Sequence, residues 1–228
     1  MTATPAQVGP GRLVLLASAL ALVACASPAP DRYHTLRPAL QGANAPAVSA
    51  PWVLRVGPVT VPETLDREAW VVRTGSTGLQ VFEQQRWPQA LSSEVAQSLA
   101  DHLGRLGLPA GWVAIAGPAT APAELRLRLE VLRFDSTLVP APGISQQMRW
   151  SLECAQTDAT GRARVLHSAL RSIETPVAAL PAAAAEESQA RFERLAQGHA
   201  QALQALAQDI HTAARSSLAA WPKACAER

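Results

Sequence analysis

The residue whose surroundings predict the most specific chemistry is Cys25. Arg12 is followed by an uninterrupted run of apolar and small residues from Leu13 to Val23, and the segment ends as Leu22-Val23-Ala24-Cys25. The run is too short to span a bilayer comfortably and has the layout of the hydrophobic region of a secretory signal. Small residues directly before a cysteine are the pattern of a bacterial lipobox. We therefore predict cleavage before Cys25 and a lipid on its thiol; the alternative is an ordinary cleaved signal with an incidental cysteine.

The other two cysteines are candidates for a disulfide. Secretion would place Cys154 and Cys225 in an oxidising compartment, where two remaining cysteines suggest one bridge. Cys154 follows Met148, Trp150 and Leu152 at period two, so we expect it to face the core of the protein. A Cys154–Cys225 bond would close a loop of about 70 residues and stabilise the fold by a few kcal/mol. The alternative is one buried thiol and one free thiol.

No set of residues predicts catalysis or metal binding. The sequence contains five histidines, but His199 and His211 are twelve residues apart and do not form a close pair on one helix face. It contains no HExxH, CxxC or GxSxG motif and no Walker loop. Glu186-Glu187 is more simply explained as acids at the positive end of a helix. We expect no enzyme activity, no metal and no cofactor.

Length and charge limit the class of protein. The signal would occupy residues 1–24, and its removal from the 228-residue chain leaves 204 residues, enough for one domain and a tether. Residues 25–51, which begin with the lipidated cysteine, are rich in Pro and Ala and predict a semi-extended tether. Within it, residues 33–36 are compatible with a short strand, whose docking would shorten the free tether. The folded domain is expected at 52–228. With 20 basic and 18 acidic side chains in the whole chain, no charge excess suggests a nucleic-acid partner.

Hydrophobic periodicity predicts a single α+β domain with a largely antiparallel sheet and two packed helices. In the first half, Pro58 and Pro62 make a fully paired position near the end of the first strand improbable. Gly75 to Gly78 predicts a hairpin turn. Leu91, Val95, Leu99, Leu103 and Leu106 predict the apolar face of a helix that begins at Trp87-Pro88. The expected strands are 52–61, 69–73, 78–83 and 112–116.

The second half predicts an antiparallel meander and a long helix. Residues 125–134 alternate between apolar and charged side chains, with a change of phase that indicates a bulge near Val131-Leu132. Strands 146–156 and 162–173 follow, joined by a short turn. A helix from Pro181 to Pro222 then carries one apolar stripe. Its members are Phe192, Leu195, His199, Leu203, Leu206, Ile210, Leu218 and Trp221.

One segment is distinctive enough to indicate a family. Residues 56–67 read V-G-P-V-T-V-P-E-T-L-D-R, followed by Val71-Val72-Arg73 and by Arg86-Trp87 before the first helix. Tyr33-His34-Thr35-Leu36 follows the lipobox at the expected place. In this order the motifs resemble the PqiC/YmbA-type ABC-transport auxiliary lipoproteins over most of the mature chain. The V-P-E-x-L-D-R run is the most specific part of the resemblance.

That resemblance implies a function. Such lipoproteins act beside an MCE-domain protein and an ABC transporter that move phospholipids or other hydrophobic molecules across a Gram-negative envelope. The lipoprotein is expected to be held by its lipid anchor at the periplasmic face of the outer membrane, where it docks the conduit, and Ala26 agrees with outer-membrane sorting. The alternatives are a structural or assembly lipoprotein without a part in lipid transport and a periplasmic hydrolase. A homo-oligomer is compatible with the sequence.

The same segment supplies the candidate partner-binding residues. We hypothesise that residues 56–73 form a sheet edge or loop surface that faces the MCE protein. Alternatively, Leu65 and Trp70 are core residues, and Arg67 and Arg73 bind backbone carbonyls. For Arg126, Arg128 and Arg133, a solvated sheet face is favoured over binding of lipid headgroups. The candidate partner-binding residues are Pro62, Glu63, Leu65, Asp66, Arg67 and Arg73.

Overall fold

The structure is a computed structural model that describes residues 30–38, 52–121, 124–177, 185–218 and 225. The chain divides into two compact units, Met1–Asp31 and Arg32–Arg228. The first unit contains the expected signal peptide and Cys25, which lie outside the described residues. The fold and the sites reported below all belong to the second unit.

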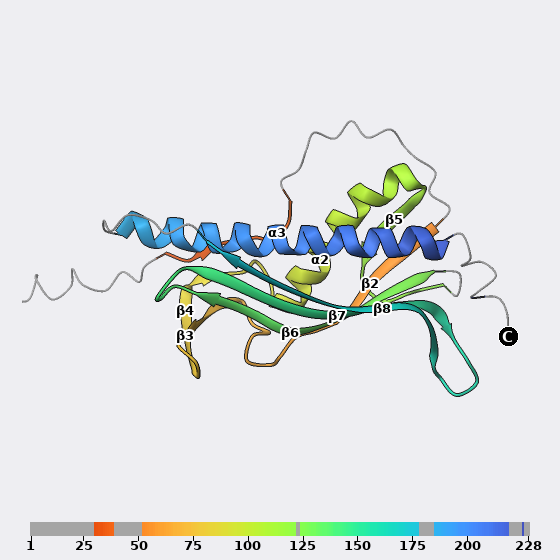
Figure 1. The fold of residues 1–228 in the computed structure, drawn as a ribbon, viewed down its shortest axis with the longest axis horizontal. Coiled ribbons are helices and arrows are strands. Elements are labelled where there is room, and N and C mark those ends of the chain that lie inside the picture. Colours follow the sequence, from red (N-terminus) through yellow and green to blue (C-terminus); the bar gives the residue numbers. More distant parts are fainter. Residues whose placement is uncertain (1–29, 39–51, 122–123, 178–184, 219–224, 226–228) are drawn as a thin grey trace, which may run out of the picture. The chain divides into compact units, whose positions relative to one another are not determined.

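The described elements follow the predicted order of strands, helix, strands and helix (Figure 1). The first half contains β1 (Arg32–Tyr33), β2 (Trp52–Thr60), β3 (Ala69–Thr74), β4 (Gly78–Arg86) and α2 (Leu91–Gly107). A short 3-10 helix, Leu108–Ala110, leads to β5 (Trp112–Ala116). The second half contains β6 (Leu125–Thr137), β7 (Gly143–Thr157), β8 (Ala163–Pro176) and α3 (Ala185–Leu218).

The eight strands form one mixed sheet with β6 at its centre. On one edge, β6 pairs antiparallel with β7, which pairs antiparallel with β8, so the predicted meander is confirmed. On its other edge, β6 pairs in parallel with β2, and β2 pairs in parallel with β5. A single parallel pair, Arg73 with Thr137, connects β6 to the predicted hairpin of β3 and β4. The α+β class is confirmed, and the parallel pairs make the sheet mixed.

Two local details test the predictions made from the sequence. The register between β6 and β7 shifts between Val131 and Arg133, which confirms the predicted bulge. Helix α2 begins at Leu91, not at Trp87-Pro88 as predicted, because the preceding Ala90 has an extended backbone (ψ 143°). Trp87 is instead a core residue. Its N–H donates to the carbonyl of Glu68 at 2.8 Å, and its side chain is only 3% exposed.

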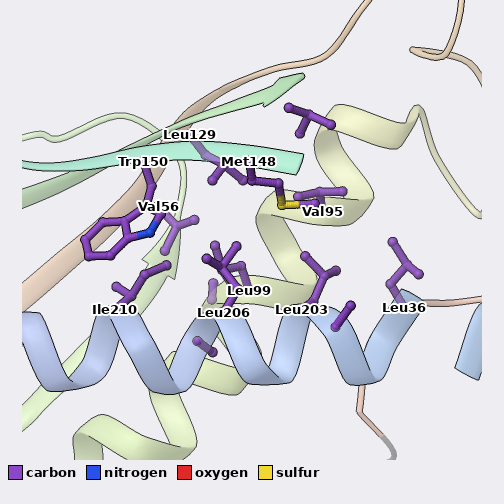
Figure 2. Packing of buried hydrophobic residues seen from close by; sticks show 14 of the residues in the cluster. Leu36, Val56, Val95, Leu99, Leu129, Met148, Trp150, Leu203, Leu206 and Ile210 are labelled. Atoms are coloured by element: carbon purple, nitrogen blue, oxygen red, sulfur yellow. The ribbon is translucent and has the colours of Figure 1, made fainter. Parts of the chain in front are cut away.

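Helices α2 and α3 cover one face of the sheet and bury its apolar side chains (Figures 1 and 2). In Figure 2, Leu203, Leu206 and Ile210 of α3 point toward Trp150 and Met148 of β7. The predicted stripe is therefore confirmed where it is described. Leu218 and Trp221 lie outside the described side chains, as do the predicted helix limits Pro181 and Pro222. The six described members of the stripe are each at most 1% exposed: Phe192, Leu195, His199, Leu203, Leu206 and Ile210.

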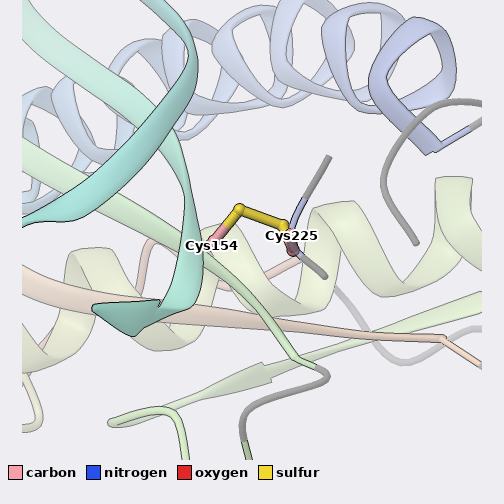
Figure 3. The surroundings of a disulfide bond; sticks show 2 residues. All are labelled: Cys154 and Cys225. Carbon is pink, nitrogen blue, oxygen red and sulfur yellow. A yellow bond between two sulfur atoms is a disulfide. The ribbon is translucent and has the colours of Figure 1, made fainter. Parts of the chain in front are cut away.

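A disulfide joins Cys154 of β7 to Cys225, which lies beyond α3 in the sequence (Figure 3). It is the pair expected from the sequence. The two residues are 71 positions apart, and their Cα atoms are 5.6 Å apart. The bond attaches the end of the chain to the sheet.

The segment that precedes β2 contributes to the domain, as the docking alternative expected. β1 pairs in parallel with β4, and the His34 N–H donates to the carbonyl of Arg86 at 2.8 Å. Leu36 is completely buried in the core. The described fold therefore begins at Arg32, whereas the sequence placed residues 32–38 in the tether and began the domain at residue 52.

Candidate functional site

The distinctive segment of the sequence lies beside an open groove of about 690 Å³, which we call the β2–α2 groove. One wall is residues 56–59 of β2, and another is residues 116–118, at the end of β5. The third wall is the start of α2 with the residues before it. Gly57 has a φ of +145°, and a Cβ there would lie 3.3 Å from the carbonyl oxygen of Gly117. Glycine thus allows the two strands to approach closely at the groove. The lining residues of the third wall are Gln89, Ser92, Ser93, Ala96 and Gln97.

The groove lies where one edge of β2 loses its described partner. The ladder between β2 and β5 ends at Val56 paired with Ala116, and the Gly117 N–H donates to the Val56 carbonyl at 3.0 Å. Beyond this point β2 continues to Thr60 and is paired with β6 on its other edge. Pro58 removes one N–H donor from this stretch. An extended segment from another protein could pair with this edge of β2 beyond the end of β5, a binding mode known as strand addition.

Four of the predicted partner-binding residues lie together on one exposed turn between β2 and β3. Pro62, Glu63, Asp66 and Arg67 are all exposed. The Asp66 N–H donates to the Pro62 carbonyl at 3.0 Å, which closes the turn. The Asp66 Oδ1 atom accepts the Ser92 N–H at 2.9 Å, which attaches the turn to the start of α2 and to the rim of the groove.

The remaining two predicted residues have other surroundings. Leu65 is partly buried against the core, to which Trp70 also belongs at 1% exposed. The Arg73 guanidinium forms two hydrogen bonds to the Asp135 carboxylate, at 2.8 and 3.1 Å. The hydrogen bond to Asp135 raises the pKa of Arg73 above its already high value. Arg73 therefore binds a carboxylate of β6 and lies apart from the exposed turn.

The arginines on the uncovered face of β6 are paired with acids. Glu153 lies 3.2 Å from Arg126 and 3.5 Å from Arg128, and Asp135 lies 3.6 Å from Arg133. Glu153 and Asp135 are buried, whereas Arg128 and Arg133 are exposed. Because Glu153 is shared by Arg126 and Arg128, and Asp135 by Arg73 and Arg133, the acids offset part of the positive charge of this face. This arrangement agrees with the predicted solvated face.

Glu124 organises the loop before β6. Its carboxylate accepts two hydrogen bonds from Arg55, at 3.0 and 2.8 Å, and the backbone N–H of Thr120 and of Ala121. Burial alone would raise the pKa of Glu124, but the hydrogen bonds from Arg55 and the two backbone N–H groups outweigh it and lower the pKa to about 2. The group is therefore ionised at neutral pH and fixes the loop to β2.

A buried Ser–His pair was not foreseen from the sequence. The Ser136 Oγ atom lies 2.9 Å from His199 Nε2 and accepts the indole N–H of Trp70 at 3.0 Å. His199 Nδ1 lies 2.8 Å from the side-chain amide of Gln146. The histidine ring stacks on Phe134 at a centroid distance of 4.0 Å. His199 was predicted as a member of the apolar stripe, but no pattern in the sequence indicated its partners.

The surroundings of this pair differ from those of a hydrolase. Ser136 and His199 are at most 1% exposed. His199 Nδ1 lies beside the amide of Gln146, whereas the Nδ1 atom of a catalytic histidine is usually oriented by a carboxylate. The cavity lined by Ser136 measures about 10 Å³, room for about one water molecule. Burial lowers the pKa of His199 to about 3, so the ring is neutral at physiological pH. The cluster joins β3, β6, β7 and α3 inside the core.

Two further observations bear on the class of protein. Among the described residues, no group of three or more His, Cys, Asp or Glu side chains is arranged to hold a metal ion. Neither described helix combines the length and the apolar character needed to cross a bilayer.

Comparison with known proteins identifies relatives by sequence and by fold. A family model described as "ABC-type transport auxiliary lipoprotein component" matches residues 34–211, more than half of the chain. The crystal structure of protein XCC0632 from Xanthomonas campestris, assigned to family DUF330, is 15% identical with a TM-score of 0.56. The match covers 82% of this chain and 98% of that one. A crystal structure described as an uncharacterized protein is 21% identical with a TM-score of 0.53, over 80% and 99% of the two chains. No curated protein matches the chain.

Proposed function

Because the chain belongs to the family of ABC-type transport auxiliary lipoprotein components, we propose that it docks an MCE-domain protein of a phospholipid transport system at the outer membrane. It acts without catalysis, as a lipid-anchored accessory protein on the periplasmic side. The observation that carries this proposal is the edge of β2 that has no strand partner among the described residues beyond Val56, beside the β2–α2 groove and at the segment that most resembles the family.

The proposed anchor restricts the position of the domain. Cys25 and Arg32 are seven residues apart, so even a fully extended chain between them spans at most about 25 Å. β1 is paired with β4 from Arg32 onward. A lipid on Cys25 would therefore keep the domain close to the membrane surface. The sorting signal expected of Ala26 supports the outer membrane as that surface.

The proposed partner surface combines the groove with the exposed turn beside it. The groove supplies a strand edge and a mixed rim of small, apolar and amide side chains, which suits an extended segment of a partner. The turn adds the charged side chains of Glu63 and Arg67, both exposed. The absence of catalysis is proposed because the Ser136–His199 pair is enclosed in the core.

Filling the groove tests the docking site. Ser93 is exposed at the rim, so Ser93→Trp should place an indole in the groove without disturbing the core. We expect at least a tenfold loss of capture of the MCE-domain protein in crosslinking and mass spectrometry from native envelopes. Gln80→Trp on β4, also exposed and outside the groove, is the matched control and should retain capture.

The possible outcomes separate the two lipoprotein functions. Equal capture by Ser93→Trp and by the unchanged protein would exclude the groove as the docking site. If the unchanged protein captures only outer-membrane assembly factors, the transport function is wrong and the scaffold alternative replaces it.

A further inference from the structure

A second open groove, of about 630 Å³, lies between the docked N-terminal segment and the solvent-facing side of α3. We call it the β1–α3 pocket. Residues 32–38 supply one wall, and α3 supplies the other through Glu193 and a series of glutamines. His102 of α2 also lines the pocket. Ala196 and Ala200 leave space on the helix that larger side chains would fill.

Most polar groups around the pocket are already occupied or neutral. The Arg37 guanidinium donates to Asp101 at 2.6 Å, and His34 Nε2 lies 2.7 Å from the Gln85 side-chain oxygen. His102 is 8% exposed, and burial, assisted by the nearby Arg105, lowers its pKa, so its ring is neutral. Its Nε2 atom has no hydrogen-bond partner among the described residues.

Two opposite charges remain available in the lining. Within the part of the chain that the structure describes, neither Arg32 nor Glu193 has a side-chain hydrogen bond or ion pair. Judged by the described residues, the pocket thus offers a free cation, Arg32, on its β1 wall and a free anion, Glu193, on its α3 wall. Neutral amide side chains of Gln197 and Gln201 accompany them. A ligand that complements this lining carries one negative and one positive group.

The pocket also lies where the chain continues toward the proposed anchor. Arg32, its first lining residue, is seven residues from Cys25, so their separation is limited to about 25 Å. Tyr33, beside it, is 60% exposed although it is a large aromatic residue. Tyrosine is favoured at the boundary between a membrane and water, where its ring and its hydroxyl meet different surroundings.

We propose that the β1–α3 pocket binds the headgroup of phosphatidylethanolamine from the membrane that holds the anchor. Arg32 donates hydrogen bonds to the lipid phosphate, and Glu193 accepts hydrogen bonds from the ammonium group. The amides of Gln197 and Gln201 bind the remaining headgroup oxygens. The inference that the pocket lies near a membrane rests on the proposed lipidation of Cys25. The charge arrangement of the pocket does not depend on that lipidation.

Titration calorimetry on the full-length protein in a non-ionic maltoside detergent tests the proposal. The probes are dihexanoyl phosphatidylethanolamine, dihexanoyl phosphatidylglycerol and free O-phosphoethanolamine. We expect saturable binding of the phosphatidylethanolamine, weakened at least fivefold by Arg32→Gln and by Glu193→Gln. Glu193→Gln should weaken phosphatidylethanolamine more than phosphatidylglycerol, because only the first has an ammonium group. Arg162→Gln and Glu174→Gln, exposed and outside the pocket, are the matched controls.

Several results would overturn the proposal. No saturable binding, equal affinity for the two lipids, or an equal effect of the control variants would each exclude a zwitterionic headgroup site here. Tight binding of O-phosphoethanolamine alone would identify a soluble ligand in place of a lipid. As a second variant, Ala200→Trp occupies the space in the pocket and should abolish binding of phosphatidylethanolamine. If the unchanged protein captures the MCE-domain protein but binds no phosphatidylethanolamine, this inference is wrong and the proposed function stands. If it binds phosphatidylethanolamine at the pocket but captures no MCE-domain protein, the proposed function is wrong and this inference stands.

Discussion

At the level of single residues, the cluster around His199 combines polar and aromatic contacts inside the buried core. The ring is completely buried, contacts Ser136 and Gln146 through its two nitrogens, and stacks on Phe134. A buried polar group is tolerated only when it is hydrogen-bonded, and a half-satisfied network is unfavourable. The cluster therefore requires one arrangement of α3 on the sheet.

The lowered pKa of His199 makes stability depend on pH. The unfolded chain binds a proton at His199 below about pH 6.5, whereas the folded protein does so only near pH 3. Between these values the unfolded state holds more protons, so the free energy of unfolding falls by up to about 1.4 kcal/mol for each unit of decreasing pH. Above pH 6.5 the contribution is constant.

The variant His199→Gln should separate the pH dependence caused by His199 from that caused by Asp and Glu side chains. We expect the free energy of unfolding at pH 7 to fall by about 1–3 kcal/mol, because the partners lose hydrogen bonds. The decline of the free energy of unfolding between pH 6.5 and pH 5, measured by urea unfolding, should become shallower. His167→Gln changes an exposed histidine and should retain the slope of the unchanged protein. Parallel curves for all three proteins would contradict the assignment.

At the level of elements, the docked segment 32–38 is held mainly by side chains of α2. The Glu94 carboxylate accepts the Thr35 hydroxyl at 2.6 Å and the Leu36 N–H at 2.8 Å. The Ser98 hydroxyl donates to the Leu36 carbonyl at 2.7 Å. Leu36 itself is buried completely. One leucine thus combines an apolar contact with the core and backbone hydrogen bonds to the helix.

Truncation of this leucine should release the segment. We expect Leu36→Ala to destabilise the docked state by about 2–5 kcal/mol, because it removes a fully buried side chain and leaves a cavity. Hydrogen exchange should detect this as faster exchange of the His34 and Leu36 amides. Leu79→Ala, at a position 45% exposed, should leave these amides protected. Unchanged exchange in Leu36→Ala would mean that hydrogen bonds alone hold the segment.

The disulfide should stabilise the fold through the long loop that it closes. Replacement of Cys154 and Cys225 by serine removes a link between positions 71 residues apart. We expect the free energy of unfolding to fall by about 2–4 kcal/mol. Chemical unfolding with and without a reductant measures it, and the reductant should not affect the double serine variant. Equal stability of the oxidised and reduced protein would contradict this contribution.

The elements that the sequence predicted are those with local patterns. Alternation over residues 125–134 and helical spacing from Leu91 to Leu106 depend on neighbours along the chain, so the meander and the helix were predictable. The parallel pairing of β2 with β5 and β6 was not, because it joins residues about 60–70 positions apart whose sequences contain no sign of one another. The start of α2 was missed because Trp87 reads as a helical residue but packs against Trp70.

The candidate site was predictable in position and less so in composition. The family-like run placed it at residues 56–67, and the exposed turn at 62–67 lies there. Arg73 was separated from it by an ion pair with Asp135, a residue 62 positions away. The β1–α3 pocket was not predicted, because it depends on the docking of residues that were assigned to the tether.

At the level of the whole protein, the exposed turn offers a direct test of charge in partner binding. The Arg67 side chain is exposed and has no ion pair among the described residues, so Arg67→Glu should not disturb folding. We expect it to reduce capture of the MCE-domain protein by about fivefold to tenfold, since reversing a charge at an interface opposes binding. Pull-down from native envelopes measures capture, and the thermal midpoint verifies folding. Full capture by a folded Arg67→Glu protein would remove the turn from the interface.

The docking of β1 also determines how the domain responds to force. A chain attached to a membrane through Cys25 transmits any pull to Arg32, the first residue of the strand that pairs in parallel with β4. The load then reaches the pairing of β1 with β4, the hydrogen bonds of Glu94 and Ser98 and the buried side chain of Leu36 before it reaches the central strands. Tension on the tether would thus act first on the docked segment 32–38. Detachment of these seven residues would lengthen the tether and leave the disulfide and the central strands intact.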